Sequence, residues 1–246
     1  MTARTAIVVG VGAQQGLGAA LCRRFAAQGY HVLVAGRTEA KLNKVVATIR
    51  AAGGSAEAVR TDATREADVL RLFDRGMSPG DGRAPVDLIV SNPGNNQRLD
   101  FREVSVETFE DFWRAGCLSG FLVGREAARR LVPFGRGTVI FTGASASLRG
   151  KPGFAHFAAA KAGLRAIAQS MAREYGPFGL HVAHVIIDGG IDGERLHSRF
   201  PQLVQERGEN GLLSTEAIAE AYWQLHCQHP SAWTQELDLR PFKEQF

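Results

Sequence analysis

The chain has 246 residues, of which 45% are hydrophobic, and this length and composition suit one α/β domain spanning residues 1–246 without a second domain. Its formal net charge is +4, but Lys and Arg are scattered along the chain instead of forming a basic run, which argues against nucleic acid as a partner. Cys22, Cys117 and Cys227 are odd in number and lack the spacing of a zinc site, so we expect no disulfide framework, no metal, and a reducing, cytoplasmic environment.

An uncharged stretch comes first, over residues 5–22, and it approaches the length of a membrane span or a signal peptide. Four glycines and the Gln14–Gln15 pair interrupt its apolar character, and no other segment approaches the length that crosses a bilayer. We therefore expect a protein that does not enter a membrane.

Short runs rich in β-branched residues alternate with longer segments rich in Ala, Leu and Arg. The short runs predict strands at residues 6–9, 31–35, 56–60, 86–90, 138–141, 181–187 and 235–239. The longer segments predict helices at residues 17–28, 39–52, 65–75, 105–132, 154–175 and 215–229. Thr38 and Thr64 are the expected N-caps, and Gly53 is an expected helix stop.

The repeated order of strand, helix and strand indicates the architecture. It is typical of an α/β fold with a doubly wound parallel sheet, the Rossmann fold, in which helices cover both faces in three α/β/α layers. Ligands bind such sheets outside the carboxyl ends of the strands.

The first strand runs directly into a glycine-rich turn and then a helix, Val8-Val9-Gly10-Val11-Gly12-Ala13-Gln14-Gln15-Gly16-Leu17-Gly18. Glycines there permit a tight turn and let the backbone approach a pyrophosphate, which the free N–H groups of the helix N-terminus stabilise. Glycines also serve plain tight packing, but this position in an alternating chain favours a dinucleotide site.

The second strand indicates which dinucleotide is bound. Its end, at Gly36, has no carboxylate to bind ribose hydroxyls, and Arg37 follows directly, as a 2′-phosphate would require. We therefore predict NADP(H), with NAD(H) as the alternative cofactor and a solvated loop cation as the alternative role of Arg37.

In these motifs and their order, the chain resembles the short-chain dehydrogenase/reductase family over nearly its whole length. The spacing of Gly12, Gly16 and Gly18 matches the glycine motif of that family, although Val11 replaces its usual Thr. Ser91-Asn92-Pro93-Gly94 lies where the family has Asn-Asn-Ala-Gly, and Ile187-Asp188-Gly189 resembles its Pro-Gly turn.

The resemblance implies a cofactor site and a substrate lid. The implied cofactor-binding residues are Gly12, Gln14, Gln15, Gly16, Leu17, Gly18, Arg37, Asp62, Ala63, Asn92, Gly94, Lys161, Gly189 and Ile191. A mobile lid is expected around residues 191–213, and it would set a substrate identity that the sequence does not reveal. Homodimers or homotetramers packed through the helices at 105–132 and 154–175 are also expected by resemblance.

Family members use a tyrosine four residues before a lysine, with a serine and an asparagine, to move a proton while hydride moves to or from the nicotinamide. Here Lys161 is present, but Phe157 stands at the tyrosine position. Ala144 falls at the serine position, where a one-residue shift would let the neighbouring Ser145 substitute, and Cys117 falls at the asparagine position. The chain is similar to an atypical subgroup of the family that carries this Phe.

Three side chains are candidates to replace the missing tyrosine hydroxyl. His156 has a suitable intrinsic pKa but points about 100° away from Phe157 on a helix. Ser145 is a poor acid without a partner, and a cysteine such as Cys117 inside a long helix is more often a small buried hydrophobe. Asp188 is a further candidate, for which capping the local turn is the simpler role.

Two hypotheses about function remain open at this point. The first is an NADP(H)-dependent oxidoreductase acting on a small, fairly apolar carbonyl or alcohol with a degenerate catalytic tetrad. The second is a catalytically silent NADP(H)-binding protein, a sensor or an assembly partner. Both predict that the cofactor binds, so only hydride transfer separates them.

Overall fold

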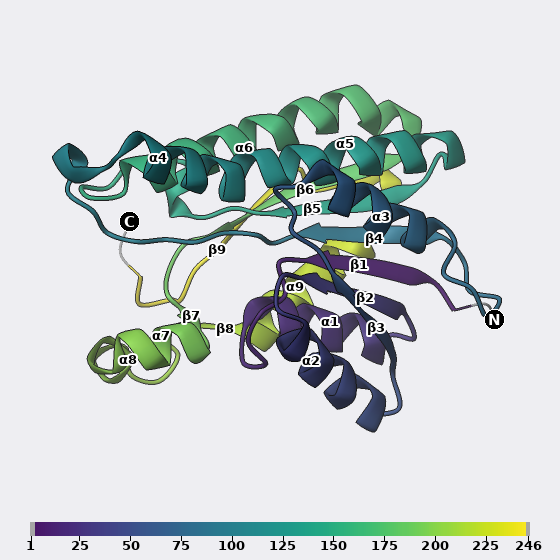
Figure 1. Ribbon diagram of the computed structural model, residues 1–246, viewed down its shortest axis with the longest axis horizontal. Coiled ribbons are helices and arrows are strands. Elements are labelled where there is room, and N and C mark those ends of the chain that lie inside the picture. The colour runs from purple at the N-terminus through teal and green to yellow at the C-terminus, as the bar shows by residue number, and fades with distance from the viewer. Residues whose placement is uncertain (1–2, 245–246) are drawn as a thin grey trace.

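The computed structural model describes residues 3–244, which fold into a central sheet between two layers of helices (Figure 1). The strands of this sheet are β1 (Thr5–Val9), β2 (His31–Gly36), β3 (Ser55–Arg60), β4 (Val86–Ser91), β5 (Gly137–Thr142), β6 (Leu180–Ile187) and β9 (Glu236–Leu239). They pair in the order β3-β2-β1-β4-β5-β6-β9, and every pair is parallel. The predicted doubly wound α/β fold is confirmed.

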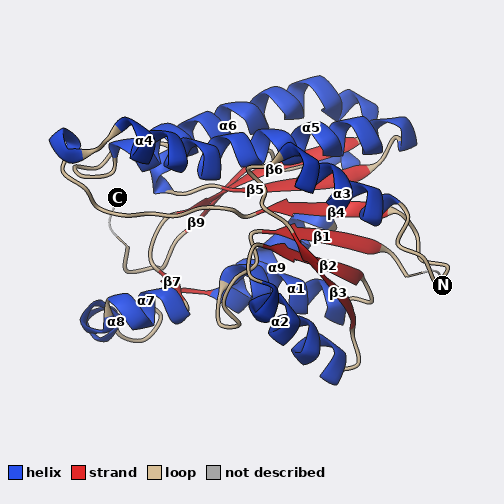
Figure 2. Cartoon of the chain, in the orientation of Figure 1, coloured by secondary structure: helices blue, strands red, loops and turns tan. Residues whose placement is uncertain are grey.

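Two groups of helices cover the two faces of the sheet, as Figure 2 shows. One face carries α1 (Leu17–Ala27), α2 (Glu39–Ala51) and α9 (Thr215–His226), and the other carries α3 (Glu66–Met77), α4 (Val106–Trp113), α5 (Ser119–Leu131) and α6 (Ala155–Tyr175). Side chains of each strand alternate between the two faces, so Val8 packs in the core beneath α1 whereas Ile7 packs in the core beneath α3 and α5. Burial on both faces explains why the inner strands β1, β2, β4, β5 and β6 are mostly apolar.

The predicted strands are all present, with ends that differ by at most one residue. Among the helices, the prediction of one helix over residues 105–132 was wrong. A π-helical turn, η2 (Arg114–Leu118), interrupts it and separates α4 from α5. At this turn Gly116 lies so close to α6 that a Cβ on it would stand 3.0 Å from the Cβ of Ala160.

The predicted helix ends had mixed outcomes. Thr38 is the N-cap residue of α2 and Gly53 follows its C-cap with a positive φ of 80°, as expected. The prediction for Thr64 was wrong, because Arg65 is the N-cap residue of α3. The Thr64 hydroxyl instead donates to Asp62 Oδ1 at 2.8 Å, an Asx-type bond that competes with capping.

A small appendage leaves the sheet after β6. The short strands β7 (Ile191–Asp192) and β8 (Leu213–Ser214) pair with each other, and α7 (Glu194–Arg199) and α8 (Pro201–Arg207) lie between them in the chain. Figure 1 places this appendage at the side of the molecule where the parallel strands end. Within residues 3–244, no helix combines the length and the apolar character that crossing a bilayer requires.

Candidate cofactor and active site

Three glycines in and beside the turn between β1 and α1 have different structural roles. Gly10 has a φ of +89°, and both its N–H and that of Val11 donate to Ala35 O. A Cβ on Gly18 would lie 3.0 Å from Val11 Cα and 3.1 Å from Gly10 O, so Gly18 lets α1 pack closely on the turn. A Cβ on Gly12 would meet no atom within 4 Å, which leaves this backbone open to a ligand.

The N-terminus of α1 completes an anion site at this turn. Its N-cap residue is Gly16, which supplies no side-chain cap for the N–H groups of the first turn. Backbone N–H groups and the positive end of the helix dipole therefore face the open side of the turn. Gln14 and Gln15 are exposed beside it, and Leu17 is buried under it.

The ends of β2 and β3 lie beside this turn. Arg37 directly follows β2 and is exposed, and within residues 3–244 no carboxylate forms an ion pair with it. At the end of β3, Asp62 accepts from the N–H and the hydroxyl of Thr64 through Oδ1, and Ala63 is buried. The edge thus presents Arg37, which has no counter-charge within residues 3–244, and the Asp62 carboxylate, whose Oδ2 accepts no hydrogen bond from the described residues.

The loop after β4 brings the first strand and α6 together. Asn92 donates from Nδ2 to Gly10 O at 3.3 Å, which ties this loop to the glycine turn. Pro93 O accepts from Lys161 Nζ at 3.4 Å, and Thr142 O at the end of β5 accepts from the same nitrogen at 2.8 Å. Gly94 is exposed, and a Cβ on it would approach Lys161 Nζ to 3.3 Å.

Lys161 is therefore held at the carboxyl edge of the sheet by backbone carbonyls. Its side chain is 4% exposed, and among residues 3–244 no carboxylate pairs with it. Burial without a counter-charge disfavours the ammonium form and lowers the pKa of Lys161 to about 8.

The other predicted catalytic positions lie around the start of α6. Phe157 is one helical turn before Lys161 on the same face of α6, and it is partly buried. The 3-10 turn η4 (Ser145–Ser147) follows β5, and Ala144 is its N-cap residue. Ala144 and Ser145 are both partly buried. No described side chain hydrogen-bonds to the Ser145 hydroxyl.

Beneath η4 lies a polar network that sequence reasoning did not predict. Ser147 Oγ accepts from the Ala144 N–H at 3.1 Å and lies 3.3 Å from His184 Nε2. The other ring nitrogen of His184, Nδ1, donates to Glu236 Oε2 at 3.1 Å, and Arg165 binds both oxygens of Glu236 at 2.6 and 2.7 Å. His184 is thus a hydrogen-bonded interior histidine.

Burial sets the charge of this network. His184 is fully buried, and desolvation lowers its pKa to about 4, so the ring is neutral at pH 7. The proton on Nδ1 forms the hydrogen bond to Glu236. Nε2 therefore carries no proton and accepts a hydrogen bond from the Ser147 hydroxyl. The hydrogen bond from Arg165 holds the pKa of Glu236 below its usual range.

Cys117 and His156 each pack against other parts of the protein. Cys117 lies in the π-helical turn η2 and is 5% exposed, with its Sγ 2.8 Å from the position of a Cβ on Gly163. Burial raises the pKa of the Cys117 thiol. His156 Nε2 lies 3.1 Å from Gln97 O, and its ring packs edge-on against Phe112 at 4.3 Å.

Asp188 follows β6 and is ion-paired. Its carboxylate is 1% exposed and accepts from Arg149 Nη2 at 3.0 and 2.9 Å, with Arg240 Nη2 at 3.6 Å. This pairing ties the loop after β5 to the end of β6, and sequence reasoning gave no signal for it because the two residues are 39 positions apart. Gly189 follows with a φ of +154°.

The appendage reaches across the edge of the sheet in two places. The Glu194 N–H donates to Gln15 O at 3.0 Å, next to the glycine turn. Arg195 Nη2 donates to Asn95 Oδ1 at 2.5 Å and to Asn96 O at 2.7 Å, in the loop after β4. Ile191, at the base of the appendage, pairs with Leu213 in the small sheet.

Known proteins are similar to this chain in sequence and in fold. A family model described as short chain dehydrogenase matches residues 5–202. A crystal structure of a short-chain dehydrogenase from Rhodopseudomonas palustris is 40% identical, with a TM-score of 0.81 over 97% of this chain and 99% of that one. The oxidoreductase YuxG of Bacillus subtilis (strain 168) is 32% identical over 188 residues, which span 75% of this chain but 27% of YuxG.

A more distant structure shows the fold alone. A gluconate 5-dehydrogenase from Burkholderia cenocepacia J2315, in complex with NADP and tartrate, is 20% identical with a TM-score of 0.83. The match covers 98% of this chain and 95% of that one.

Gly12 and Gly18 form a matched pair that separates ligand binding from folding. We expect Gly12→Ala to leave the melting temperature unchanged, because the added methyl enters open space, and to weaken dinucleotide binding by roughly tenfold or more. Gly18→Ala should cost about 1–3 kcal/mol of stability, because its methyl meets backbone. Thermal denaturation measures the stability of both variants, and calorimetric titration measures their dinucleotide affinity. Equal losses of stability in the two variants would contradict the separate roles of Gly12 and Gly18.

Proposed function

Because this chain belongs to the short-chain dehydrogenase family, we propose that it is an NADP(H)-dependent oxidoreductase that interconverts a carbonyl and an alcohol with an incomplete catalytic tetrad. One observation carries the proposal. The open glycine turn, the loop from Asn92 to Gly94 and the Lys161 ammonium meet at a single edge of the sheet. The substrate we propose is small and fairly apolar.

The residues at this edge fit a nicotinamide dinucleotide. The space that a Cβ on Gly12 would fill, and the uncapped first turn of α1, suit a pyrophosphate. Lys161 would bind the nicotinamide ribose, Asp62 and Ala63 would lie beside the adenine, and Gly189 and Ile191 would line the nicotinamide end. The cofactor, when bound, supplies or accepts the hydride.

Arg37 supports a preference for NADP(H) over NAD(H). No carboxylate ends β2, and Arg37 has no ion-pair partner within residues 3–244, so it is available to a 2′-phosphate. The gluconate 5-dehydrogenase of similar fold was solved with NADP, which agrees with this preference.

The catalytic tetrad is atypical in this proposal, as in the subgroup with Phe before the lysine. Lys161 remains, Phe157 brings no hydroxyl, and Cys117 replaces an amide by a buried thiol. Ser145 is the nearest hydroxyl in sequence to the serine position at Ala144, and it would orient the substrate oxygen. The residues from 191 to 213 would act as the lid, since contacts of Glu194 and Arg195 already cross the edge.

An NADP(H)-binding protein without activity is the rival function. Both functions predict cofactor binding, and transfer of label separates them. The screen uses NADPH deuterated at the transferable position and a panel of apolar aldehydes and ketones. We expect deuterium to appear in the product of at least one of these compounds. Binding without transfer across the panel would favour the silent protein.

Arg37→Gln tests the cofactor preference. Removing the guanidinium should weaken NADPH binding by about tenfold or more, since hydrogen bonds to charged groups contribute roughly 1.5–3 kcal/mol, while NADH binding stays the same. Arg173→Gln, at an exposed site on α6, removes the same charge and serves as the control. Calorimetry measures all four affinities, and an equal loss for both cofactors would reject the proposed contact.

Phe157→Tyr tests the proposed catalytic position. A hydroxyl one helical turn before Lys161 should raise the rate of hydride transfer, and general acid–base help is typically worth ~10²–10⁴-fold. Stopped-flow measurement of NADPH oxidation on the best compound of the panel gives the rate. If the rate does not rise, the replacements at Ala144 and Cys117 have dismantled the site as well.

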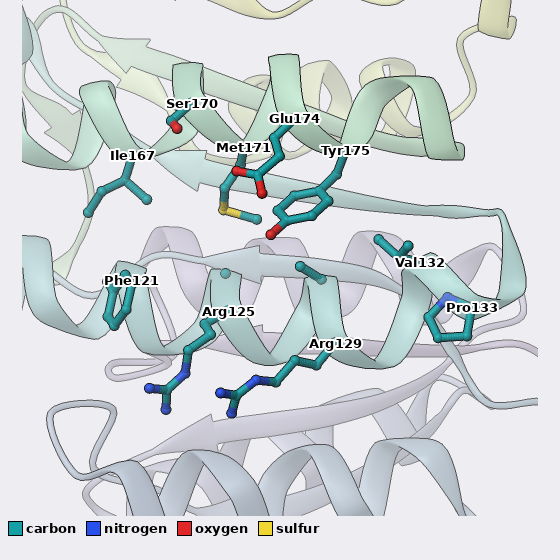
Figure 3. A pocket seen from close by; sticks show the side chains of 12 residues that line it. Phe121, Arg125, Arg129, Val132, Pro133, Ile167, Ser170, Met171, Glu174 and Tyr175 are labelled. Carbon is teal, nitrogen blue, oxygen red and sulfur yellow. The ribbon is translucent and has the colours of Figure 1, made fainter.

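A surface groove between α5 and α6 supports homodimers or homotetramers (Figure 3). Its lining includes Phe121, Ile167, Met171 and Tyr175, and Phe121 is 43% exposed. Contiguous apolar surface of this kind is typical of an interface. We propose that these two helices pack against those of a second copy.

Phe121→Glu tests this interface. The charge should shift the protein toward a monomer in light scattering, because removing a carboxylate from water in an interface is costly. Phe200→Glu, at an exposed aromatic residue of the appendage, should leave the mass unchanged. A wild-type monomer at micromolar concentration would contradict the proposal.

A further inference from the structure

The side chains that might replace the missing tyrosine are engaged elsewhere. His156 lies against Phe112 and Gln97 O, and the Cys117 sulfur lies against Gly163. Asp188 is buried in its pair with Arg149. Ser147 and His184 bond to each other beneath η4, and both are buried.

Lys161 has a different arrangement. An amine nitrogen has four tetrahedral positions, one of which is the bond to Cε. Thr142 O and Pro93 O, at 2.8 and 3.4 Å, occupy two of the remaining three. Within residues 3–244, no further acceptor bonds to Nζ.

The third position has no acceptor among residues 3–244. Gly94, an exposed residue of the proposed site, lies beside Nζ, since a Cβ there would stand at 3.3 Å. As an ammonium, Lys161 has a third N–H at this position, and as a neutral amine it has a lone pair there. The two bonds to carbonyl oxygens persist in both states, so a proton can leave and return without moving the side chain.

From this geometry we infer that Lys161 is itself the general acid and base of the reaction, in place of the tyrosine that the chain lacks. The inference rests on the proposed oxidoreductase function. It assigns a proton-transfer role to a lysine that the resemblance assigns only to binding the ribose and assisting a hydroxyl.

The charges around Lys161 favour exchange of this proton near neutral pH. His184 on β6 interacts electrostatically with Lys161, and its ring is neutral above its lowered pKa of about 4. Glu236 on β9 is neutralised by Arg165, and the Tyr222 hydroxyl of α9 donates to Thr142 Oγ1. Burial raises the pKa of the Cys117 thiol of η2, so it is also protonated. Within residues 3–244 no carboxylate pairs with the ammonium, and burial lowers its pKa to about 8.

The proton balance is complete in either direction. In reduction, a bound NADPH would supply the hydride for the new C–H bond at the carbonyl carbon, and the π electrons would move to oxygen. The oxygen takes the third proton of Lys161, directly or through an intervening hydroxyl, and the neutral amine is reprotonated from water. In oxidation, the neutral amine accepts the alcohol proton, and NADP+ would accept the hydride that leaves the carbon.

Titration of Lys161 by NMR tests the inference without any substrate. The sequence contains five lysines, so the spectrum of protein labelled with ¹³C at Lys Cε is simple, and Lys161→Met assigns the signal. We expect the Lys161 signal to titrate near pH 8. A Lys161 signal that stays in the ammonium form at pH 10 would overturn the inference, whatever the activity.

The pH dependence of label transfer is the second measurement. Reduction with saturating deuterated NADPH should slow above the NMR midpoint of Lys161. Oxidation of the labelled alcohol with saturating NADP+ should slow below it. Lys161→Arg keeps the charge but does not lose a proton in this range, so transfer should fall by about 10²–10⁴-fold and lose its pH dependence. Lys151→Arg should match the wild type.

The outcomes separate the inference from the proposed function. Label transfer that is unchanged in Lys161→Arg, or that ignores the Lys161 midpoint, rejects the role of Lys161 and leaves the oxidoreductase standing. NADPH binding with no label transfer by the wild type rejects the oxidoreductase and the inference with it. If Lys161→Arg does not fold, the NMR midpoint and the wild-type pH profile still decide.

Discussion

The buried ammonium of Lys161, held by two backbone carbonyls, is the interaction on which the site depends. A charge taken out of water without a counter-ion is costly, and here the sheet and the loop after β4 offset that cost only with the oxygens of Thr142 and Pro93. Those oxygens lie together because β4 and β5 are parallel neighbours that end at the same edge. The fold therefore sets both the place and the proton affinity of this amine.

The loop that carries Ala144 and Ser145 is held from below by the network of Ser147, His184 and Glu236. Gly143 is required by this network, since a Cβ there would stand 2.3 Å from His184 Nε2. The Ala144 N–H bonds to the Ser147 hydroxyl, which bonds to the His184 ring. The ring bonds in turn to Glu236, which is paired with Arg165 of α6. Every polar group named here has a partner, so burial rigidifies the loop instead of destabilising it. Rigidity at η4 keeps Ser145 at a constant position relative to Lys161.

The sequence was a good guide to features with a short-range signal. Apolar runs predicted all seven strands of the sheet, and the spacing of glycines predicted a turn in which Gly10, Gly12 and Gly18 have separate roles. The break between α4 and α5 could not be predicted, because a π-helical turn leaves the helical pattern of residues nearly intact.

Long-range contacts explain the rest of what the sequence could not reveal. The pairs of Asp188 with Arg149 and of His184 with Glu236 join residues 39 and 52 positions apart, and no local pattern marks either partner. The roles of Phe157, Ser145 and the 191–213 segment stay predictions, since they depend on ligands.

Phe157 and the low proton affinity of Lys161 are physically coupled. The two residues are one helical turn apart on the same face of α6, so whatever stands at position 157 is part of the surroundings of the amine. A phenol there would offer the ammonium an acceptor and, when ionised, a counter-charge, and both would favour the protonated amine. A phenyl ring offers neither. In the proposed mechanism, the missing hydroxyl therefore removes one proton donor and makes its neighbour a better one, so a single replacement would relocate acid–base chemistry without altering the cofactor site.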